Sequence, residues 1–527
     1  MKKIAVWLPL ICGSMLAAGV WLGSLIPSGY RVIPGNEATE KIKAVMGYVE
    51  RYYVDSVNRK ELTEKTITSM LQSLDPHSDY FSAEQIKVMN EPLRGNFEGI
   101  GIEYNFIRDT LVVMDVIRNG PSEKAGLHPG DKIISADGKP LTGKEINDKS
   151  VRAQLRGPSG TKVKVGVKRY SEKSIREFEI VRGSVPIYSV EASYMLNAET
   201  GYIRLARFAE TSYEEFKQAG DSLLRLGMKK MVLDLRGNGG GLLNIAVSIA
   251  DEFLESGKMI VYTKGRADGR EDYKATARGR FEKMPLAVLV DENSASASEI
   301  IAGAIQDNDR GIIIGRRTFG KGLVQEEKVL ADGSAFRLTI ARYYTPTGRC
   351  IQKPYSKGID DYLAEETRRY HNGELIHADS VHFPDSLKFR TPKGKVVYGG
   401  GGIMPDIFVP LDTSRGSGYL NELYYNNIFT VWALRYAADF GAALKKKGPE
   451  DFRKNFKTSR SDISQLSVIA HHVAGIKADN NAIQKSESRI HNYMKAYLSK
   501  VLWGDTGYFM IWNDADAAIQ KALESLN

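Results

Sequence analysis

Three short, largely apolar runs most constrain the fold of this chain. They cover residues 231–235, 286–290 and 312–314. Runs of this length without regular polar alternation are typical of strands that are buried on both faces, as in a parallel sheet. The first two lead through loops of small residues into helical apolar spacing at 242–254 and 299–305. Strand, loop and helix in this order predict an α/β core.

The segments on either side of this region have a different texture. From 37 to 91, apolar residues recur every three or four positions, as in helices, with a stop at Asp75-Pro76. Residues 93–183 contain short β-rich runs separated by turns. Helical spacing returns beyond residue 412, without a motif that assigns a function. We therefore predict five parts: a leader (1–29), a helical segment (30–92), a β-rich module (93–183), the α/β core (184–411) and a helical C-terminal extension (412–527).

The leader has the pattern of an export signal. Lys2 and Lys3 precede an uncharged, mostly apolar stretch that runs to Tyr30, and a basic start followed by an apolar run is typical of exported proteins. The stretch is long enough for an uncleaved membrane anchor, and the small residues around Ala17 equally allow cleavage. A buried N-terminal helix is the alternative. We predict a protein on the periplasmic side of a bacterial cell envelope, either secreted or anchored to the inner membrane.

Charge and cysteine content exclude several classes of protein. Lys and Arg number 73 against 64 Asp and Glu, so a net charge of +9 is spread over 527 residues. The basic runs are short, which argues against nucleic-acid binding. Only two cysteines occur, Cys12 and Cys350, and they exclude a disulfide framework and a four-cysteine zinc site.

A loop of small residues, 291–296, joins the run 286–290 to its helix. At the start of a helix the backbone N–H groups point outward unpaired, so Ser296 is well placed for a nucleophile beside an oxyanion hole. The alternative is structural, because Ser296 and Glu299 have the spacing of a capping box. The loop alone leaves both interpretations open.

Two further loops follow the other runs. The loop 237–241 contains three consecutive glycines, which allow a ligand or a developing oxyanion to approach the backbone closely. Leu242 stands where a dinucleotide fingerprint needs a glycine, so a Rossmann site is excluded, and a plain turn remains the alternative. The loop 315–322 has the spacing of a phosphate loop, but Gly322 replaces the Ser or Thr that would hold magnesium.

This last loop places Lys321 between two glycines, with Gln325 four positions on. A surface lysine is the default interpretation. In a confined site, burial would lower the pKa of Lys321 and let it act as a general base. None of the eight histidines neighbours the three loops, which makes a Ser–Lys dyad more economical than a Ser–His–Asp triad.

Together the loops resemble those of the carboxyl-terminal processing (tail-specific) proteases of serine peptidase family S41. The matching stretches, in the family's order, are LDPHSDY (74–80), GIGIEY (99–104), AGLHPGD (125–131), LDLRGNGGGLL (233–243), SASASEIIAGAIQD (294–307), GRRTFGKGLVQ (315–325), RYYTPTGR (342–349) and GGIMPDI (401–407). The resemblance implies an α/β core of the crotonase/ClpP type, with a PDZ domain inserted at 93–183 and helical segments at both ends.

The resemblance also implies the site residues. It makes Ser296 the nucleophile, Lys321 the general base and Gln325 the residue that orients the lysine, with no metal and no cofactor. For the oxyanion hole it implies the backbone N–H groups of Ala297 and Gly240, and Gly241 is a near alternative. The glycine loop departs from the family's usual Asn-Asn-Pro-Gly-Gly or Asn-Asn-Ser-Gly-Gly, because this chain has Gly-Asn-Gly-Gly-Gly at 237–241.

In the PDZ domain, the resemblance makes Gly99, Ile100, Gly101 and Ile102 the carboxylate-binding loop. Consecutive N–H groups would capture a terminal carboxylate while the peptide adds as a strand to a sheet edge. Ile100 and Ile102 would line an apolar pocket, and a plain β-turn is the alternative. Arg156 would couple PDZ occupancy to the active site.

The resemblance thus implies an exported serine endopeptidase that recognises the free apolar C-termini of loosely folded proteins. Its partners are polypeptide substrates, with a homodimer or an adaptor bound through residues 412–527 as further possibilities. Two alternatives remain: a catalytically silent PDZ scaffold and a remote crotonase-like acyl-CoA enzyme.

Overall fold

The structure is a computed structural model that describes residues 37–169, 172, 174–381, 383–413 and 416–527. The predicted leader, 1–29, lies outside these residues. The chain divides into two compact units, Met1–Ser69 and Met70–Asn527. The described part of the first unit holds helix α2 (Glu37–Tyr52), which buries none of its residues, and most of α3 (Arg59–Gln72). Within the described ranges, no helix is both long and apolar enough to span a bilayer.

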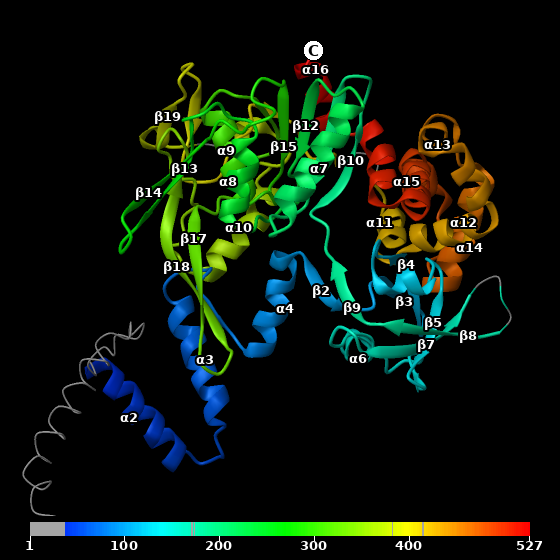
Figure 1. Ribbon diagram of the computed structural model, residues 1–527, viewed down its shortest axis with the longest axis horizontal. Helices are drawn as coiled ribbons and strands as arrows, with labels where there is room; N and C mark the ends of the chain where they lie inside the picture. Colours follow the sequence, from blue (N-terminus) through cyan, green and yellow to red (C-terminus); the bar gives the residue numbers. More distant parts are fainter. Residues whose placement is uncertain (1–36, 170–171, 173, 382, 414–415) are drawn as a thin grey trace, which may run out of the picture. The chain divides into compact units, whose positions relative to one another are not determined.

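The centre of the second unit is a six-stranded sheet with the order β10-β11-β12-β15-β16-β21 (Figure 1). Strand β10 runs antiparallel to β11, and all the following neighbours run parallel. The strands are β10 (Val190–Met195), β11 (Thr200–Leu205), β12 (Lys230–Asp234), β15 (Leu286–Val290), β16 (Ile312–Gly315) and β21 (Ile407–Phe408). The three apolar runs in the sequence form β12, β15 and β16, so the predicted α/β core is confirmed.

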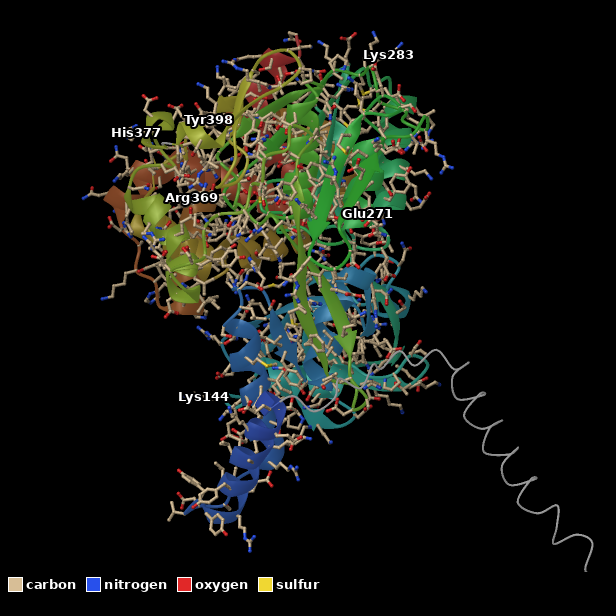
Figure 2. All side chains as sticks on the ribbon, turned by 90° about the vertical axis from the view of Figure 1, so that its left-hand side faces the viewer. Lys144, Glu271, Lys283, Arg369, His377 and Tyr398 are labelled. Carbon is tan, nitrogen blue, oxygen red and sulfur yellow. The ribbon has the colours of Figure 1, made fainter. Side chains whose placement is uncertain are left out.

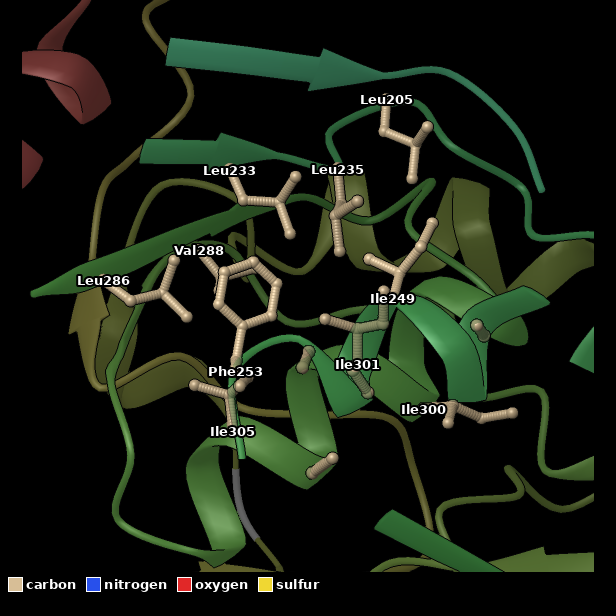
Figure 3. Close-up of a cluster of buried hydrophobic side chains, with 14 of the residues drawn as sticks. Leu205, Leu233, Leu235, Ile249, Phe253, Leu286, Val288, Ile300, Ile301 and Ile305 are labelled. Atoms are coloured by element: carbon tan, nitrogen blue, oxygen red, sulfur yellow. The ribbon is translucent and has the colours of Figure 1, made fainter. Parts of the chain in front are cut away.

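Different parts of the chain cover the two faces of this sheet. Three helices lie on one face: α7 (Ser212–Arg225), α8 (Leu243–Asp251) and α9 (Ala297–Asp307). Leu233 and Val288 point from the strands into this layer, where they meet Phe253 and Ile301 (Figure 3). Val232, the neighbour of Leu233, faces the opposite layer with residues of α16 (Ala517–Ser525). The C-terminal extension therefore supplies part of one layer of the α/β core.

A second, largely antiparallel sheet borders the first. Its order is β1-β18-β13-β14, and β17 pairs with β18. The strands are β1 (Asp79–Phe81), β13 (Met259–Gly265), β14 (Arg270–Lys274), β17 (Leu323–Val329) and β18 (Ala335–Tyr344). Strand β1 lies within the segment 30–92, for which the sequence predicted helices and no strand. Its three residues pair with β18, so an edge supplied by a distant part of the chain overrides the local helical spacing. Helix α4 (Ala83–Arg94) follows β1.

The β-rich module forms its own sheet, in the order β3-β4-β5-β7-β8 with β6 on β5. Its elements are β3 (Ile102–Ile107), β4 (Thr110–Val116), α5 (Pro121–Ala125), β5 (Lys132–Ala136), β6 (Lys139–Pro140), α6 (Asp148–Leu155), β7 (Lys162–Lys168) and β8 (Arg176–Val181). Its two ends are joined by pairing of β2 (Asn96–Gly99) with β9 (Gly183–Pro186). This pairing brings entry and exit together, as expected for an inserted domain.

The remaining helices are α10 (Ile359–His371) within the core region and, in the C-terminal extension, α11 (Gly418–Tyr425), α12 (Ile428–Lys447), α13 (Pro449–Asn455), α14 (Arg460–Ala474) and α15 (Asn480–Trp512). Two short strands, β19 (Lys388–Arg390) and β20 (Val396–Tyr398), pair with each other. The extension has its own apolar core, in which Trp432 and Phe452 are buried. The helical texture predicted beyond residue 412 is therefore borne out.

A buried ion pair locks the end of α9 to the loop after β18. Asp307 Oδ1 lies 2.7 Å from Arg349 Nη2, and neither side chain is exposed to solvent. Asp307→Asn would leave the Arg349 guanidinium without its counter-charge, so we expect the free energy of unfolding to fall by about 3–5 kcal/mol. Asp361→Asn is the control, because the Asp361–Arg368 pair is exposed and its loss should cost less than about 1 kcal/mol. Urea unfolding measures both, and equal losses would contradict the prediction.

Candidate active site

Ser296 occupies a strained turn between β15 and α9. Its backbone angles are φ 54° and ψ −112°, a conformation that residues other than glycine rarely adopt and that costs of order 1–3 kcal/mol. The turn is fixed to the end of β12, because Ser294 Oγ donates to Leu235 O (2.8 Å). A strained strand–turn–helix connection of this kind projects its side chain away from the sheet, and Ser296 remains partly exposed.

Lys321 lies on the loop that enters β17. Its Nζ donates to Gln325 Oε1 over 3.1 Å. Burial lowers the pKa of Lys321, as does the positive charge of Arg337, while Asp75 and Glu299 act in the opposite direction. The balance favours the neutral amine at a lower pH than for a lysine in water, which is what a general base needs.

Helix α10 holds the loop before Lys321 in place. Arg369 donates to Thr318 O (3.1 Å) and pairs with Glu374 (2.7 Å). Figure 2 labels Arg369, which is buried, together with His377 and Lys283, which are exposed. The buried guanidinium of Arg369 bonds backbone oxygens of the loop and restricts its movement. The backbone at Lys321 is therefore held in place.

One cavity brings the predicted catalytic residues together. Its volume is about 590 Å³, and Ser296, Lys321 and Gln325 all line it. The other lining residues are Asn90, Leu93, Arg94, Glu210, Gly239, Gly241, Leu242, Leu243, Ala297, Ile300, Leu323, Val324, Glu326, Glu327, Arg337 and Tyr343. The lining combines apolar side chains, such as Leu242 and Ile300, with charged ones, such as Glu210 and Arg337.

Glu299 connects the serine turn to the lysine loop. Its carboxylate is fully buried and accepts hydrogen bonds from the N–H groups of Ser296 (2.8 Å) and Lys321 (2.9 Å). It also accepts from the Gly320 N–H (2.7 Å) and the Thr318 hydroxyl (2.5 Å). Burial raises the pKa of Glu299 to about 7, against the effect of these donors. The capping box predicted as an alternative to catalysis is thus part of the site.

The glycine loop lies directly against the serine turn. A Cβ atom at Gly240 would stand 2.8 Å from Ser296 Cβ and 3.0 Å from the Ala297 nitrogen, and the φ of Gly240 is 102°. Both facts require glycine at this position. The Gly240 N–H donates to Asn238 Oδ1 (2.9 Å), whereas Gly241 and Ala297 line the cavity themselves. Gly240 and Ala297 stay the predicted oxyanion donors, with Gly241 as the alternative.

Asn238 is a link that the sequence alone did not reveal. It is buried, and its Nδ2 donates to Leu205 O (2.8 Å). Its backbone carbonyl oxygen accepts from the Ala295 N–H (3.0 Å) and the Ser298 hydroxyl (2.8 Å). The glycine loop and the serine turn therefore share hydrogen bonds, and one cannot shift without disturbing the other.

The motif at residues 74–80 reaches the site through His77. The His77 carbonyl oxygen accepts from Gln325 Nε2, which leaves Gln325 Oε1 turned toward Lys321. Asp75 Oδ1 fixes this segment by accepting from the His77 N–H (2.8 Å) and from Thr339 Oγ1 (3.0 Å). Burial and the nearby Lys321 lower the pKa of His77 to about 4, so the imidazole is neutral at physiological pH.

The predicted carboxylate loop lies where β2 ends and β3 begins. Gly101 has a φ of 79°, and its carbonyl oxygen accepts from the Ile117 N–H (3.1 Å). Ile102 is half-buried, but Ile100 is only 3% exposed and belongs to the core of this module. The apolar pocket predicted at Ile100 and Ile102 stays a prediction. The Arg156 guanidinium pairs with Glu91 on α4 (2.8 Å).

Comparisons with known proteins identify the family of the chain. Sequence profiles match a PDZ domain at residues 99–180, peptidase family S41 at 199–361 and a family of unknown function at 419–504. The carboxy-terminal-processing protease of Bartonella bacilliformis is 38% identical over 404 residues, which cover 72% of this chain and 92% of that protein. The carboxy-terminal processing protease CtpA of Bacillus subtilis is 34% identical over 349 residues, covering 66% and 73% respectively.

Among solved structures, the photosystem II D1 C-terminal processing protease is 26% identical, with a TM-score of 0.37 over 71% of this chain and 94% of that one. The sequence matches show the class of protein: the chain is a serine peptidase that carries a PDZ domain. More narrowly, it belongs to peptidase family S41, among the carboxy-terminal processing proteases.

Proposed function

We propose that this chain is an exported endopeptidase that captures the free apolar C-termini of loosely folded proteins and cleaves them with a Ser296–Lys321 dyad. The observation that carries this proposal is the single cavity that holds Ser296 on its strained turn together with Lys321. Burial lowers the pKa of Lys321, and Gln325 holds its Nζ at 3.1 Å.

The reaction begins with the neutral amine of Lys321. The amine takes the proton of Ser296 Oγ as the oxygen attacks the carbonyl carbon of the scissile peptide bond. The carbonyl oxygen becomes an oxyanion, which the N–H groups of Ala297 and Gly241 stabilise, or that of Gly240 if it exchanges its bond to Asn238 Oδ1 for one to the oxyanion. The Lys321 ammonium then protonates the leaving amine, and an acyl-enzyme ester on Ser296 remains. Water attacks this ester by the same route, with Lys321 again as the base.

Export and tail recognition rest on the sequence and on the PDZ module. The basic and apolar leader favours a place in the cell envelope. The loop 99–102 offers backbone N–H groups near a sheet edge, which is how PDZ domains bind a terminal carboxylate. Membership of a peptidase family argues against the acyl-CoA alternative. A silent scaffold would have no use for a general base with a lowered pKa.

The test compares two forms of one unfolded protein substrate, with a free and with an amidated apolar C-terminus. We expect the wild-type protein to cleave both, with a KM about 10–100-fold higher for the amide, which corresponds to the loss of a charged hydrogen-bond acceptor. Ser296→Ala should cleave neither. Products are identified by mass spectrometry. Equal KM values would refute tail capture, and cleavage by Ser296→Ala would refute the nucleophile. Binding of the free tail without cleavage would favour the scaffold.

A further inference from the structure

The glycine loop begins with an arginine that the C-terminal helix holds. Arg236 follows β12, and its Nε and Nη2 lie 3.0 Å and 2.7 Å from the two oxygens of Asp234. Asp234 is fully buried, so this side of the guanidinium is fixed inside the core. The remaining terminal nitrogen, Nη1, donates to Asp516 Oδ2 over 2.7 Å.

Asp516 is itself held in one position. It is the N-cap of α16, and its Oδ1 accepts from the N–H groups of Ala518 (2.8 Å) and Ile519 (3.1 Å). Its side chain is only 11% exposed. The start of a helix also favours a negative charge. Since α16 packs on the sheet through Ala518 and Ile519, the carboxylate is a rigid anchor for Arg236.

Because Arg236 is held by Asp516, the start of the glycine loop that follows it is also held in place. The Arg236 carbonyl oxygen accepts from Arg204 Nη2 (3.0 Å), and the next N–H, that of Gly237, donates to Asp291 Oδ1 (2.9 Å) at the base of the serine turn. The backbone carbonyl oxygen of Asn238 then accepts a hydrogen bond from the Ala295 N–H in the serine turn. Arg236 thus stands at the start of a short chain of contacts that ends at the cavity.

We propose that Asp516 is a positioning residue for peptide cleavage. Its carboxylate, supplied by the last helix of the chain, fixes Arg236 and so holds the glycine loop 237–241 at the distance from Ser296 that oxyanion binding requires. This gives a role to a part of the C-terminal extension beyond the segment 419–504 that matches a family of unknown function. The inference rests on the proposed function, because it takes the glycine loop to bind the oxyanion.

Asp516→Asn is the direct test. The amide oxygen can still cap α16, but the NH2 group then faces Arg236 Nη1, and two donors meet. We expect kcat to fall about 10–100-fold, with KM changed less than about threefold because substrate binding does not use the loop's donors. Affinity for a peptide boronate, whose serine adduct places an oxygen in the oxyanion hole, should fall by the same factor as kcat.

Asp514→Asn is the matched control. Asp514 lies two residues away and pairs with Arg453 (2.6 Å) in the helical extension, not with Arg236. We expect its kcat to stay within about twofold of wild type, since an exposed pair contributes little. A second variant, Arg236→Lys, keeps the positive charge but loses the fork that holds both aspartates. It should show the same loss of kcat as Asp516→Asn.

Circular dichroism and the thermal midpoint report whether each variant is folded. The proposal is overturned if Asp516→Asn and Asp514→Asn have the same kcat, if boronate affinity does not follow kcat, or if the loss of activity equals the loss of folded protein. Arg236→Lys decides the matter when Asp516→Asn does not fold. Cleavage that persists in Ser296→Ala would instead refute the proposed function, so the two failures are distinguishable.

Discussion

Replacing Lys321 with methionine is expected to lower kcat roughly 1,000-fold or more. Methionine keeps an unbranched apolar side chain of similar length, so it fills the same space. It has no nitrogen to take the Ser296 proton, and Gln325, which bonds Nζ at 3.1 Å, cannot replace it because an amide is not a base. The measurement is steady-state cleavage of a quenched peptide, with circular dichroism to confirm folding.

Lys321→Arg separates base catalysis from positive charge. A guanidinium stays protonated at every accessible pH, so it keeps the charge and cannot accept the proton. We expect this variant to be as inactive as the methionine variant. An arginine variant with more than about a tenth of wild-type activity would mean that Lys321 acts by its charge.

The pH dependence follows from the same residue. Burial and Arg337 lower the pKa of Lys321 from its usual value. Below that pKa the ammonium form cannot take a proton, and above it the free amine can, so kcat/KM should rise with pH and then level off. Wild-type activity that stays flat from pH 6 to 9 would contradict the lysine base.

The sequence predicted the elements that depend on local pattern. The run 286–290 forms β15 over those residues, and one of the short β-rich runs predicted within 93–183 forms β7. Buried strands and amphipathic helices are specified by their own hydrophobic spacing. The short strand β1 was missed because its pairing partner, β18, lies more than 250 residues away.

The site residues also divide into those that local sequence pattern marks and those whose role depends on distant partners. Ser296 and Lys321 stand on loops whose small residues mark them in the sequence, and Gln325 follows Lys321 by four positions, in β17. The roles of Asn238 and Asp516 depend on contacts between segments that only the fold brings together, for example Asp516 with Arg236 across 280 positions. An aspartate before a helix looks like an ordinary N-cap, and its second partner has no local signal.

For Glu299 the sequence predicted only part of the role. Its spacing from Ser296 indicated the helix cap, but not the hydrogen bonds that it accepts from the lysine loop. Glu299→Gln is expected to lower kcat about 100-fold. All four groups bonded to the carboxylate are donors, so the NH2 group of glutamine must face two of them. The serine turn and the lysine loop then separate on one side, and a displacement of about 1 Å at reacting groups costs about that much.

The same variant has a second effect that a purely structural role would not produce. The negative charge of Glu299 raises the pKa of Lys321, opposing the effect of burial. Removing this charge therefore lowers the pKa of Lys321 further, so the rising limb of the pH–activity profile should move to lower pH while its plateau falls.

Glu292→Gln is the control for Glu299→Gln, because Glu292 lies on the loop between β15 and α9, close to Glu299 in the chain, and pairs with Arg316 (2.6 Å). It removes a charge near the serine without touching the Ser296 or Lys321 N–H groups, so kcat should stay within a few-fold of wild type and the pH profile should not move. A Glu299→Gln variant with lower kcat and an unshifted pH profile would mean that Glu299 supports the fold alone. Unchanged kcat would mean that the turn and the loop hold their positions without it.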